Sequence, residues 1–159
     1  LYQYTQLQDT VGVIMLAIDH KVPKVLTLKQ MLQKYVEFQD EVVRRRTQYD
    51  LKKAKERAHI LEGLIIASDN IDEVVHIIRG SESPSDAQRN LEKRFNLDEL
   101  QSKAIVDMRL SQLTGLRMEQ LHAEYEELMK RIEYLQQILD DPELCKKVMK
   151  DELQNVKQQ

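Results

Sequence analysis

Apolar residues recur at alternating steps of three and four over residues 28–66, the spacing that places them on one face of an α-helix. The first half of the pattern is Leu28, Met31, Tyr35, Phe38 and Val42, and the second half is Leu51, Ala54, Ala58, Leu61 and Ile65. A step of nine residues separates the halves, so we expect them to face different neighbours. Thr27 is a suitable N-cap, and the predicted helix is about 58 Å long. A helix of that length needs a partner.

A second long pattern supplies this partner. It comprises Met118, Leu121, Tyr125, Leu128, Ile132, Leu135 and Leu139, again at steps of three and four. Asp140, Asp141 and Pro142 interrupt it, with Asp141 expected to cap a final helix. That helix would carry Leu144, Val148 and Val156 on one face. Because the outgoing and returning paths have similar lengths, the pattern predicts a long antiparallel coiled-coil hairpin.

Three short helices are predicted between the two long ones. We expect the first to start at an Asn70 N-cap with Glu73 at its third position, to bury Ile71, Val74, Val75 and Ile78, and to end at Gly80. We expect the second to be capped by Ser83 and lined by Ala87, Leu91 and Phe95. We expect the third to begin at Asp98 and to be lined by Ala104, Ile105 and Met108, and the whole segment to close at Thr114 and Gly115. Together they predict a small helical globule at the tip of the hairpin.

The N-terminal residues have a different pattern. Residues 11–19 and 22–26 are β-prone and predict a short β-hairpin, with Pro23 restricted to an edge position. The turn at His20 and Lys21 lacks the glycine or asparagine that two-residue turns favour, which leaves the register open. The predicted fold class is therefore mainly α, with a coiled-coil hairpin, a globule at its tip and a β-hairpin at its open end.

Composition supports elongated helices and argues against several kinds of site. Of the 159 residues, 32% are charged and 5% are aromatic, with four glycines and three prolines. The single cysteine, Cys145, permits no internal disulfide and no cysteine-rich metal site, and we expect a reduced thiol on a helix. The four histidines show no zinc-ligand spacing. No apolar run approaches the ~20 residues of a membrane span, so the expected location is cytoplasmic. The chain begins in mid-element and is expected to be part of a longer protein.

Basic residues cluster on the first long helix. Residues 44–66 contain seven basic and three acidic side chains, in a chain of net charge −3. One interpretation is that Arg45, Lys52, Lys53 and Arg57 face DNA, since phosphate attraction needs only clustered Lys and Arg. The alternative is a solvated helix face with ordinary ion pairs four residues apart, Arg46 with Asp50 and Lys52 with Glu56.

Several runs resemble the bacterial DNA gyrase A subunit family. They are VRRRTQYDLKKA at residues 43–54, RAHILEGL at 57–64, AIVDMRL at 104–110, LTGL at 113–116 and EYEEL at 124–128. They occur in the family's order, and the resemblance extends over essentially the whole chain. The sequence departs from the family at Ser68, where an aliphatic residue is common, and at the glycine-free turn of His20 and Lys21.

The resemblance implies a type IIA topoisomerase, which cuts one duplex, passes a second through it and releases the second through an exit gate. It implies that residues 1–27 belong to a tower domain, 28–66 and 116–140 are coiled-coil arms, 67–115 are the dimerising gate and 141–159 are a final helix. The catalytic tyrosine lies upstream in the family, and ATP and Mg²⁺ bind through other regions. We therefore expect no catalytic, cofactor or metal residue here and no activity of the chain alone. The implied partners are a second copy, double-stranded DNA and the gyrase B subunit, without a membrane.

The tip is expected to carry the dimer interface, because it has more apolar residues than so small a body can easily hide. The candidates are Ile78, Met108, Arg109, Leu110 and Leu113. Arg109 is expected to bind a carboxylate or helix-end carbonyls within the globule. Tyr125 and Tyr134 are expected to be packing groups. Two alternatives stay open at this point: the same segment of topoisomerase IV, and an autonomous coiled-coil adaptor.

Overall fold

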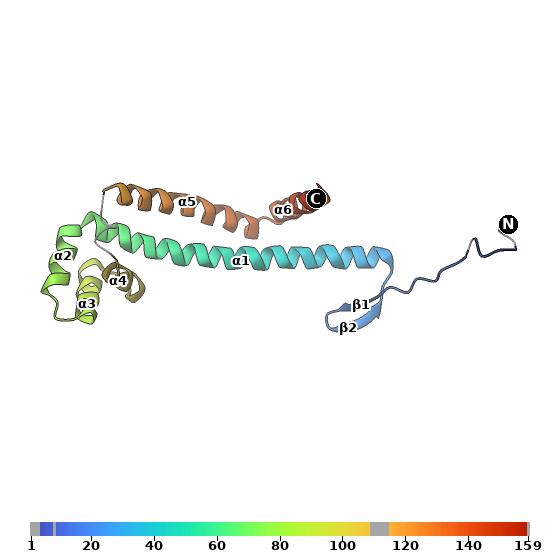
Figure 1. The fold of residues 1–159 in the computed structure, drawn as a ribbon, viewed down its shortest axis with the longest axis horizontal. Coiled ribbons are helices and arrows are strands. Elements are labelled where there is room, and N and C mark those ends of the chain that lie inside the picture. Colours follow the sequence, from blue (N-terminus) through green and yellow to red (C-terminus); the bar gives the residue numbers. More distant parts are fainter. Residues whose placement is uncertain (1–3, 8, 109–114, 159) are drawn as a thin grey trace.

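The computed structural model describes residues 4–7, 9–108 and 115–158. Helix α1 (Leu28–Asp69) has 42 residues and is therefore about 63 Å long. Helix α5 (Gly115–Asp140) runs antiparallel beside it, three short helices lie at one end of the pair and a β-hairpin lies at the other (Figure 1). The predicted fold class, mainly α with a long helix hairpin, is confirmed.

The two ends of α1 can be compared with the predicted start and end of this helix. Thr27 and Gln30 form a reciprocal capping box at the N-terminus, so the predicted start is confirmed. The helix runs through Gly63 to Asp69, three residues beyond the predicted end. Asn70 lies at the N-cap position of α2, as predicted, and its backbone oxygen accepts from the N–H of Val74 at 3.0 Å. Its side chain makes no capping bond to α2, because the amide donates to the carbonyl oxygen of Ile66 at 2.9 Å, in the last turn of α1.

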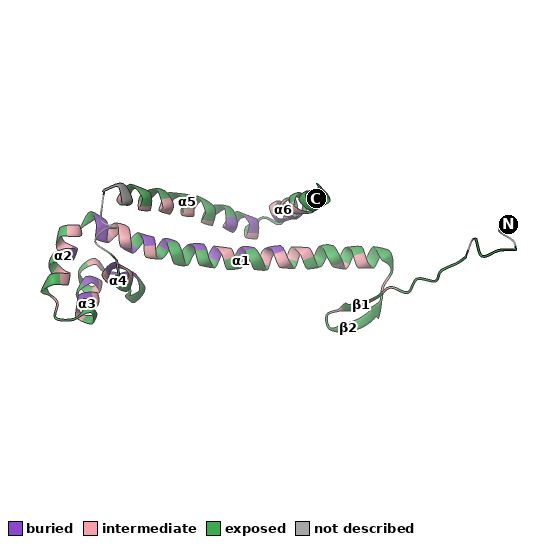
Figure 2. Ribbon diagram, viewed as in Figure 1, coloured by how far each residue is buried: buried purple, intermediate pink, exposed green. Residues whose placement is uncertain are grey.

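Burial along α1 is uneven. The buried positions in its middle are Val43, Thr47, Leu51, Ala54, Ala58 and Leu61, and they continue at helical spacing beside α5 and the tip (Figure 2). The half near the β-hairpin is mainly exposed. Leu28, Tyr35 and Phe38, which the pattern placed on the apolar stripe, are 60%, 49% and 55% exposed. The stripe of the first half thus has no helix packed along it among the described residues.

The hairpin consists of β1 (Leu16–Asp19) and β2 (Val22–Val25), paired antiparallel with Leu16 opposite Val25. His20 and Lys21 form the turn with φ angles of 48° and 66°. Positive φ at both central residues is the geometry of the tight turns that suit the twist of a hairpin, reached here without glycine. Pro23 lies opposite Ile18 in a sheet of two strands, so it is on an edge as predicted.

The tip contains α2 (Ile71–Gly80), α3 (Pro84–Phe95) and α4 (Glu99–Val106). The predicted caps of α3 and α4 are confirmed: Ser83 accepts from the backbone N–H of Asp86, and Asp98 forms a capping box with Gln101. The core joins the end of α1 to all three helices and consists of Ala67, Val74, Leu91, Leu97 and Ile105. The predicted closure at Thr114 lies outside the described residues.

The returning path bends at Asp141, which accepts a hydrogen bond from the backbone N–H of Glu143 at the start of α6 (Pro142–Gln158). A second core of Val43, Ile138, Cys145 and Met149 joins α1, α5 and α6. The predicted stripe of α5 is mostly half-buried, and Ile138 is enclosed more completely than its neighbour Leu139. The placement of Val156 on the buried face of the last helix was wrong, since it is 67% exposed.

Candidate functional site

The tip has an apolar groove of about 250 Å³ between α2 and α4. Its lining comprises Ile71, Val74, Val75, Ile78, Arg79, Ile105, Val106 and Met108. Two of the predicted interface residues, Ile78 and Met108, are thereby brought together although they are far apart in the sequence. The other three, Arg109, Leu110 and Leu113, lie outside the described residues, and so does any partner of Arg109. The interface itself stays a prediction.

The four candidate DNA-facing residues each have a carboxylate neighbour. Arg45 lies 3.9 Å from Glu41 and Lys52 lies 4.0 Å from Glu56. Lys53 donates to Glu56 over 2.9 Å, and this hydrogen bond lowers the pKa of Glu56 below its ordinary value. These side chains are about half exposed or more, and water screens surface pairs of this kind, so they contribute little to stability. Contact with DNA stays a prediction, and the described geometry also fits a solvated face with local pairs.

Arg57, the fourth candidate, has a different partner. Its guanidinium donates twice to Glu124 of α5, at 2.9 and 2.7 Å. The predicted pair of Arg46 with Asp50 was wrong, because Arg46 likewise binds an acid of the returning path, Glu152 of α6, at 2.5 Å. Both arginines therefore tie α1 to the returning helices. The basic residues of α1 and the acidic residues of the return path complement one another across the interface between them.

The bend between α5 and α6 is held by a partly buried polar cluster. Arg44 donates to Asp40 at 2.9 Å and to the carbonyl oxygen of Leu139 at 3.4 Å, at the end of α5. The thiol of Cys145 donates to the other oxygen of Asp40 at 3.4 Å. The hydrogen bond from Arg44 lowers the pKa of Asp40, whereas burial raises the pKa of the Cys145 thiol. Cys145 is thus a protonated, enclosed thiol on a helix, as expected from its position.

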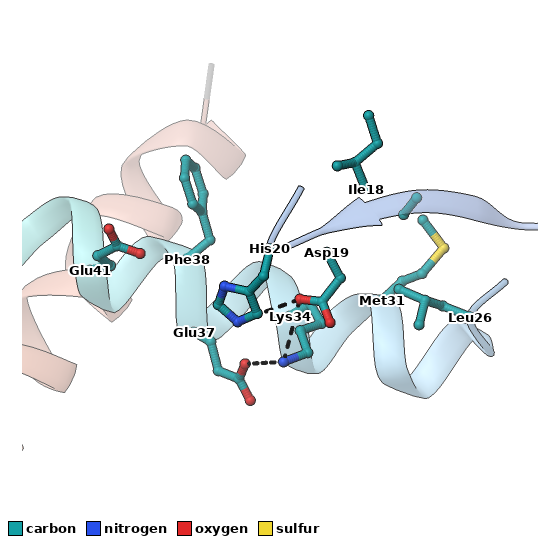
Figure 3. A pocket seen from close by; sticks show the side chains of 10 residues that line it. Ile18, Asp19, His20, Leu26, Met31, Lys34, Glu37, Phe38 and Glu41 are labelled. Atoms are coloured by element: carbon teal, nitrogen blue, oxygen red, sulfur yellow. Dashed lines mark hydrogen bonds and ion pairs between the residues drawn. The ribbon is translucent and has the colours of Figure 1, made fainter. Parts of the chain in front are cut away.

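At the N-terminal end of α1, residues of the β-hairpin and of α1 together line a pocket of about 280 Å³. Figure 3 shows Asp19 pointing toward His20 and Lys34, with Phe38 on one side of this group and Met31 on the other. Asp19 accepts from Lys24 at 2.9 Å and lies 3.6 Å from Lys34, which also binds Glu37. The hydrogen bond from Lys24 lowers the pKa of the Asp19 carboxyl. Of these pairs, the one between Asp19 and Lys34 joins the hairpin to the helix.

Tyrosines and metal-ligating groups are the remaining chemically active side chains. Tyr125 is half-buried, but Tyr134 is 50% exposed, so the expected packing role does not hold for Tyr134. Across residues 4–7, 9–108 and 115–158, no group of three or more His, Cys, Asp or Glu side chains gathers around one point. None of the helices described is long and apolar enough for a membrane crossing.

The close approach of α4 to α1 was not predicted from the sequence. Gly63 of α1 lies directly against Gln101 of α4, and Gln101 is 5% exposed. Ser102, fully enclosed, donates to Glu92 of α3 at 2.8 Å. A glycine within a strong helical pattern was the only available signal, since such a residue usually has a packing reason. Polar residues such as Gln101 and Ser102 carry no sequence signal for burial.

Comparison with known proteins places these features in a family. Over residues 1–154 the sequence matches the family of A subunits of DNA gyrase/topoisomerase IV. It is 51% identical over 157 residues to the DNA gyrase A subunit of Clostridium acetobutylicum and to that of Streptococcus pneumoniae serotype 4. It is 50% identical to the corresponding protein of Deinococcus deserti. In each case 99% of this chain is covered but only 19% of the relative.

The chain thus spans about a fifth of the length of these relatives, within which an antiparallel helix pair carries a helical tip. Its matched residues include both long helices, the whole described tip and the hairpin. By this match, the chain belongs to the family of DNA gyrase/topoisomerase IV A subunits.

Proposed function

We propose that this chain forms the exit gate of a DNA gyrase A subunit, the last opening through which a transported DNA duplex leaves the enzyme. In the whole enzyme, two copies would meet at their tips. The longer protein would act with the gyrase B subunit on double-stranded DNA in the cytoplasm, and would introduce negative supercoils with energy from ATP. The part described here would contribute dimerisation and mechanical opening rather than bond chemistry.

One observation carries the proposal: an apolar groove lies on the tip of an arm about 63 Å long, far from the hairpin at the other end (Figure 1). Apolar surface exposed on a small body is typical of an interface. Two such arms joined at their tips would enclose a space between them. A gate must also open, which favours an interface near the standard ~1,600 Å² over a more extensive one.

Gyrase is preferred over topoisomerase IV because the similar relatives are named as DNA gyrase A subunits. The two differ in reaction, so the longer protein, assembled with its B subunit, can be tested directly. We expect ATP-dependent negative supercoiling of relaxed plasmid at a higher rate than decatenation of linked circles. The reverse order of rates would assign the chain to topoisomerase IV. An autonomous adaptor would support neither reaction.

Mg²⁺ and ATP belong to other regions in this proposal. Two of the described acidic residues, Glu124 and Glu152, form ion pairs along the arms with Arg57 and Arg46. No three or more of the described His, Cys, Asp and Glu side chains converge.

The gate is tested by the association state of the chain. Sedimentation equilibrium at tens of micromolar should show a dimer for the wild type. Ile78→Asp places a charge in the groove, and Arg79→Glu reverses an exposed charge at its edge with less risk to folding. Both should weaken the dimer by about tenfold or more, since one unpaired interfacial charge costs ~2 kcal/mol or more.

Met129→Asp is the matched control, because Met129 is an exposed apolar residue on α5 rather than on the tip. It should leave the dimer intact. A wild type that stays monomeric would overturn the proposal, and so would a dimer weakened only by Met129→Asp. Circular dichroism of each variant separates loss of association from loss of fold.

A further inference from the structure

We propose that Gly63, Gln101, His59 and Asp98 form a rigid joint that sets the orientation of the tip on α1, so that the gate moves as one body with its arm. The inference rests on the proposed function, because it names the residues that position the gate. It assigns Gly63 and Gln101 as positioning residues. It also implies that the outgoing arm does not hinge where it meets the globule.

The first step is the close approach of two helices. A Cβ atom at Gly63 would lie 2.7 Å from the Cβ and 2.8 Å from the Cγ of Gln101, distances that real Cβ atoms do not occupy. Gly63 is buried in the middle of a helical stretch, where glycine costs about 1 kcal/mol relative to alanine. That cost is offset only where the missing side chain is needed. Here the missing side chain lets α4 lie directly on α1.

The second step is the hydrogen bonding of Gln101, which uses both ends of its amide. Its Nε2 donates to the backbone oxygen of His59 at 2.8 Å, and its Oε1 accepts from the backbone N–H of Asp98 at 3.2 Å. Its own backbone N–H donates to Asp98 at 2.8 Å. One enclosed side chain therefore joins α1 to the first turn of α4 with a fixed geometry.

A third contact closes the joint on its solvent side. His59 Nε2 lies 2.5 Å from Asp98 Oδ2. A carboxylate can only accept, so His59 donates from Nε2. Asp98 is thus the N-cap of α4 and a partner of α1 at the same time. A rotation of α4 on α1 would break this contact together with the hydrogen bond from Gln101 to the backbone oxygen of His59.

The globule behind the joint is itself tied together. Ser102, on the next position of α4, donates to Glu92 of α3 at 2.8 Å and is fully buried. Arg94 of α3 in turn binds Glu73 of α2. Ile105 adds an apolar contact in the shared core. Motion imposed on α4 is therefore transmitted to α3 and α2.

By contrast, the covalent connection between α1 and α2 constrains the orientation of the tip less than the contacts of α4 with α1 do. A single residue, Asn70, separates the two helices, and its side chain caps α1 without capping α2. The continuous backbone holds the start of α2 next to the end of α1, but the angle between these two helices depends on the packing of the globule. The contacts of α4 with α1 are the ones that fix this angle.

Two glycines of the chain provide a matched experiment. Gly63→Ala introduces the clash with Gln101, whereas Gly80→Ala adds the same methyl group at a helical position with nothing within 4 Å. Spin labels at Tyr49→Cys on the arm and Glu82→Cys on the tip, both exposed, report the angle between them as a distance distribution. The buried Cys145 is replaced by alanine in every variant.

We expect one narrow distribution for the unaltered joint and for Gly80→Ala. Gly63→Ala should shift the distribution or broaden it at least twofold. Gln101→Ala removes the amide without a clash and should broaden it without shifting its centre. The inference would be overturned if Gly63→Ala gave the same distance distribution as the parent protein. It would also be overturned if Gly80→Ala broadened the distribution as much as Gly63→Ala does. Circular dichroism confirms that each variant is folded before it is compared.

Sedimentation of the same proteins separates this inference from the proposed function. A monomeric parent with a narrow distribution would leave the joint intact and reject the gate. A dimeric parent with an unchanged Gly63→Ala distribution would keep the gate and reject the joint. In the whole enzyme, Gly63→Ala should lower the rate of strand passage several-fold while DNA cleavage is unchanged, and a parallel loss of cleavage would contradict the positioning role.

Discussion

The most completely enclosed residues of the chain include polar ones that lie where two elements meet. Thr47, Ser68, Gln101 and Ser102 are at most 6% exposed. Among the described side chains, no buried nitrogen or oxygen lacks a hydrogen-bond partner. Satisfied polar groups between elements fix a geometry, because a small displacement leaves a donor or acceptor unpaired at a cost of ~1–3 kcal/mol. The orientation of one helix on another is thus set at the level of single residues.

Leu61 offers a stability prediction for the apolar part of the same region. It is 0% exposed on α1, between the arm and the tip. Leu61→Ala should lower the free energy of unfolding by ~2–5 kcal/mol, through lost burial and the cavity left behind. Leu100→Ala, at a position 63% exposed on α4, should change it by less than ~0.5 kcal/mol. Urea denaturation of both variants measures the difference, and equal losses would contradict the described packing.

Asp98 gives a prediction for pH. The hydrogen bonds from His59 and from the backbone of Gln101 lower the pKa of its carboxyl in the folded protein. A carboxyl whose folded-state pKa lies below its unfolded value of ~3.9 stabilises the fold above that pH. This contribution is lost as the pH falls through the lower, folded-state pKa.

Asp98→Asn should therefore weaken the loss of stability on acidification from about pH 5 to pH 2, relative to the wild type. Thermal denaturation at a series of pH values measures this slope. Asp72→Asn, at an exposed position in the first turn of α2, is the control and should leave the slope unchanged. An unaltered slope in Asp98→Asn would mean that the contact with His59 does not persist in solution.

At the level of elements, the predictions that held depended on local rules. Thr27, Ser83, Asp98 and Asp141 are caps whose side chains bond within their own first turn, so a few neighbouring residues suffice to identify them. The long helices held for a similar reason, because periodicity over many residues is a strong signal. The hairpin was recognised from two β-prone runs.

The predictions that failed depended on partners far away in the sequence. Arg46 has a suitable acid four residues on, yet it binds Glu152 on α6, which only the folded arrangement brings near. Val156 has the right spacing for the predicted apolar face of α6, but the α6 residues that are buried in the second core are Cys145 and Met149. Of the tip groove, Ile78 and Met108 could be named from apolar content, whereas the contact of Gly63 with Gln101 could not.

Helix α5 carries a prediction at this scale. Its stripe is mostly half-buried, while Ile138 is 4% exposed at the contact with α1 and α6. Ile138→Ala should lower the free energy of unfolding by ~2–5 kcal/mol. Leu128→Ala and Ile132→Ala should each have a smaller effect, and Glu126→Ala should stay within about 0.5 kcal/mol. Equal losses of unfolding free energy in Glu126→Ala and Ile138→Ala would contradict the placement of Ile138 on the buried face of α5 and of Glu126 on its exposed face.

For the whole molecule, the arrangement separates two ends by the length of α1 (Figure 1). The hairpin rests on one end, the tip on the other, and the ion pairs of Arg57 and Arg46 hold the returning helices along the middle. One core joins α1 to the helices of the tip, and the second joins α1 to α5 and α6 at the bend of the returning path. This is a mechanical design, and it is consistent with a gate whose chemistry takes place elsewhere.

The last prediction follows from that separation of roles. The resemblance to the family implies that the tyrosine that cuts DNA lies upstream of the matched region and that ATP and Mg²⁺ bind through other regions. The chain of 159 residues, mixed with supercoiled plasmid and ATP, should therefore leave the linking number unchanged on agarose gels. The longer protein with its B partner provides the positive control under the same conditions. Relaxation by the purified chain, lost in Tyr125→Phe, would show that a half-buried tyrosine of α5 acts as a nucleophile. Relaxation that persisted in Tyr125→Phe through further purification would instead place the activity at another residue, and either result would refute a purely mechanical role.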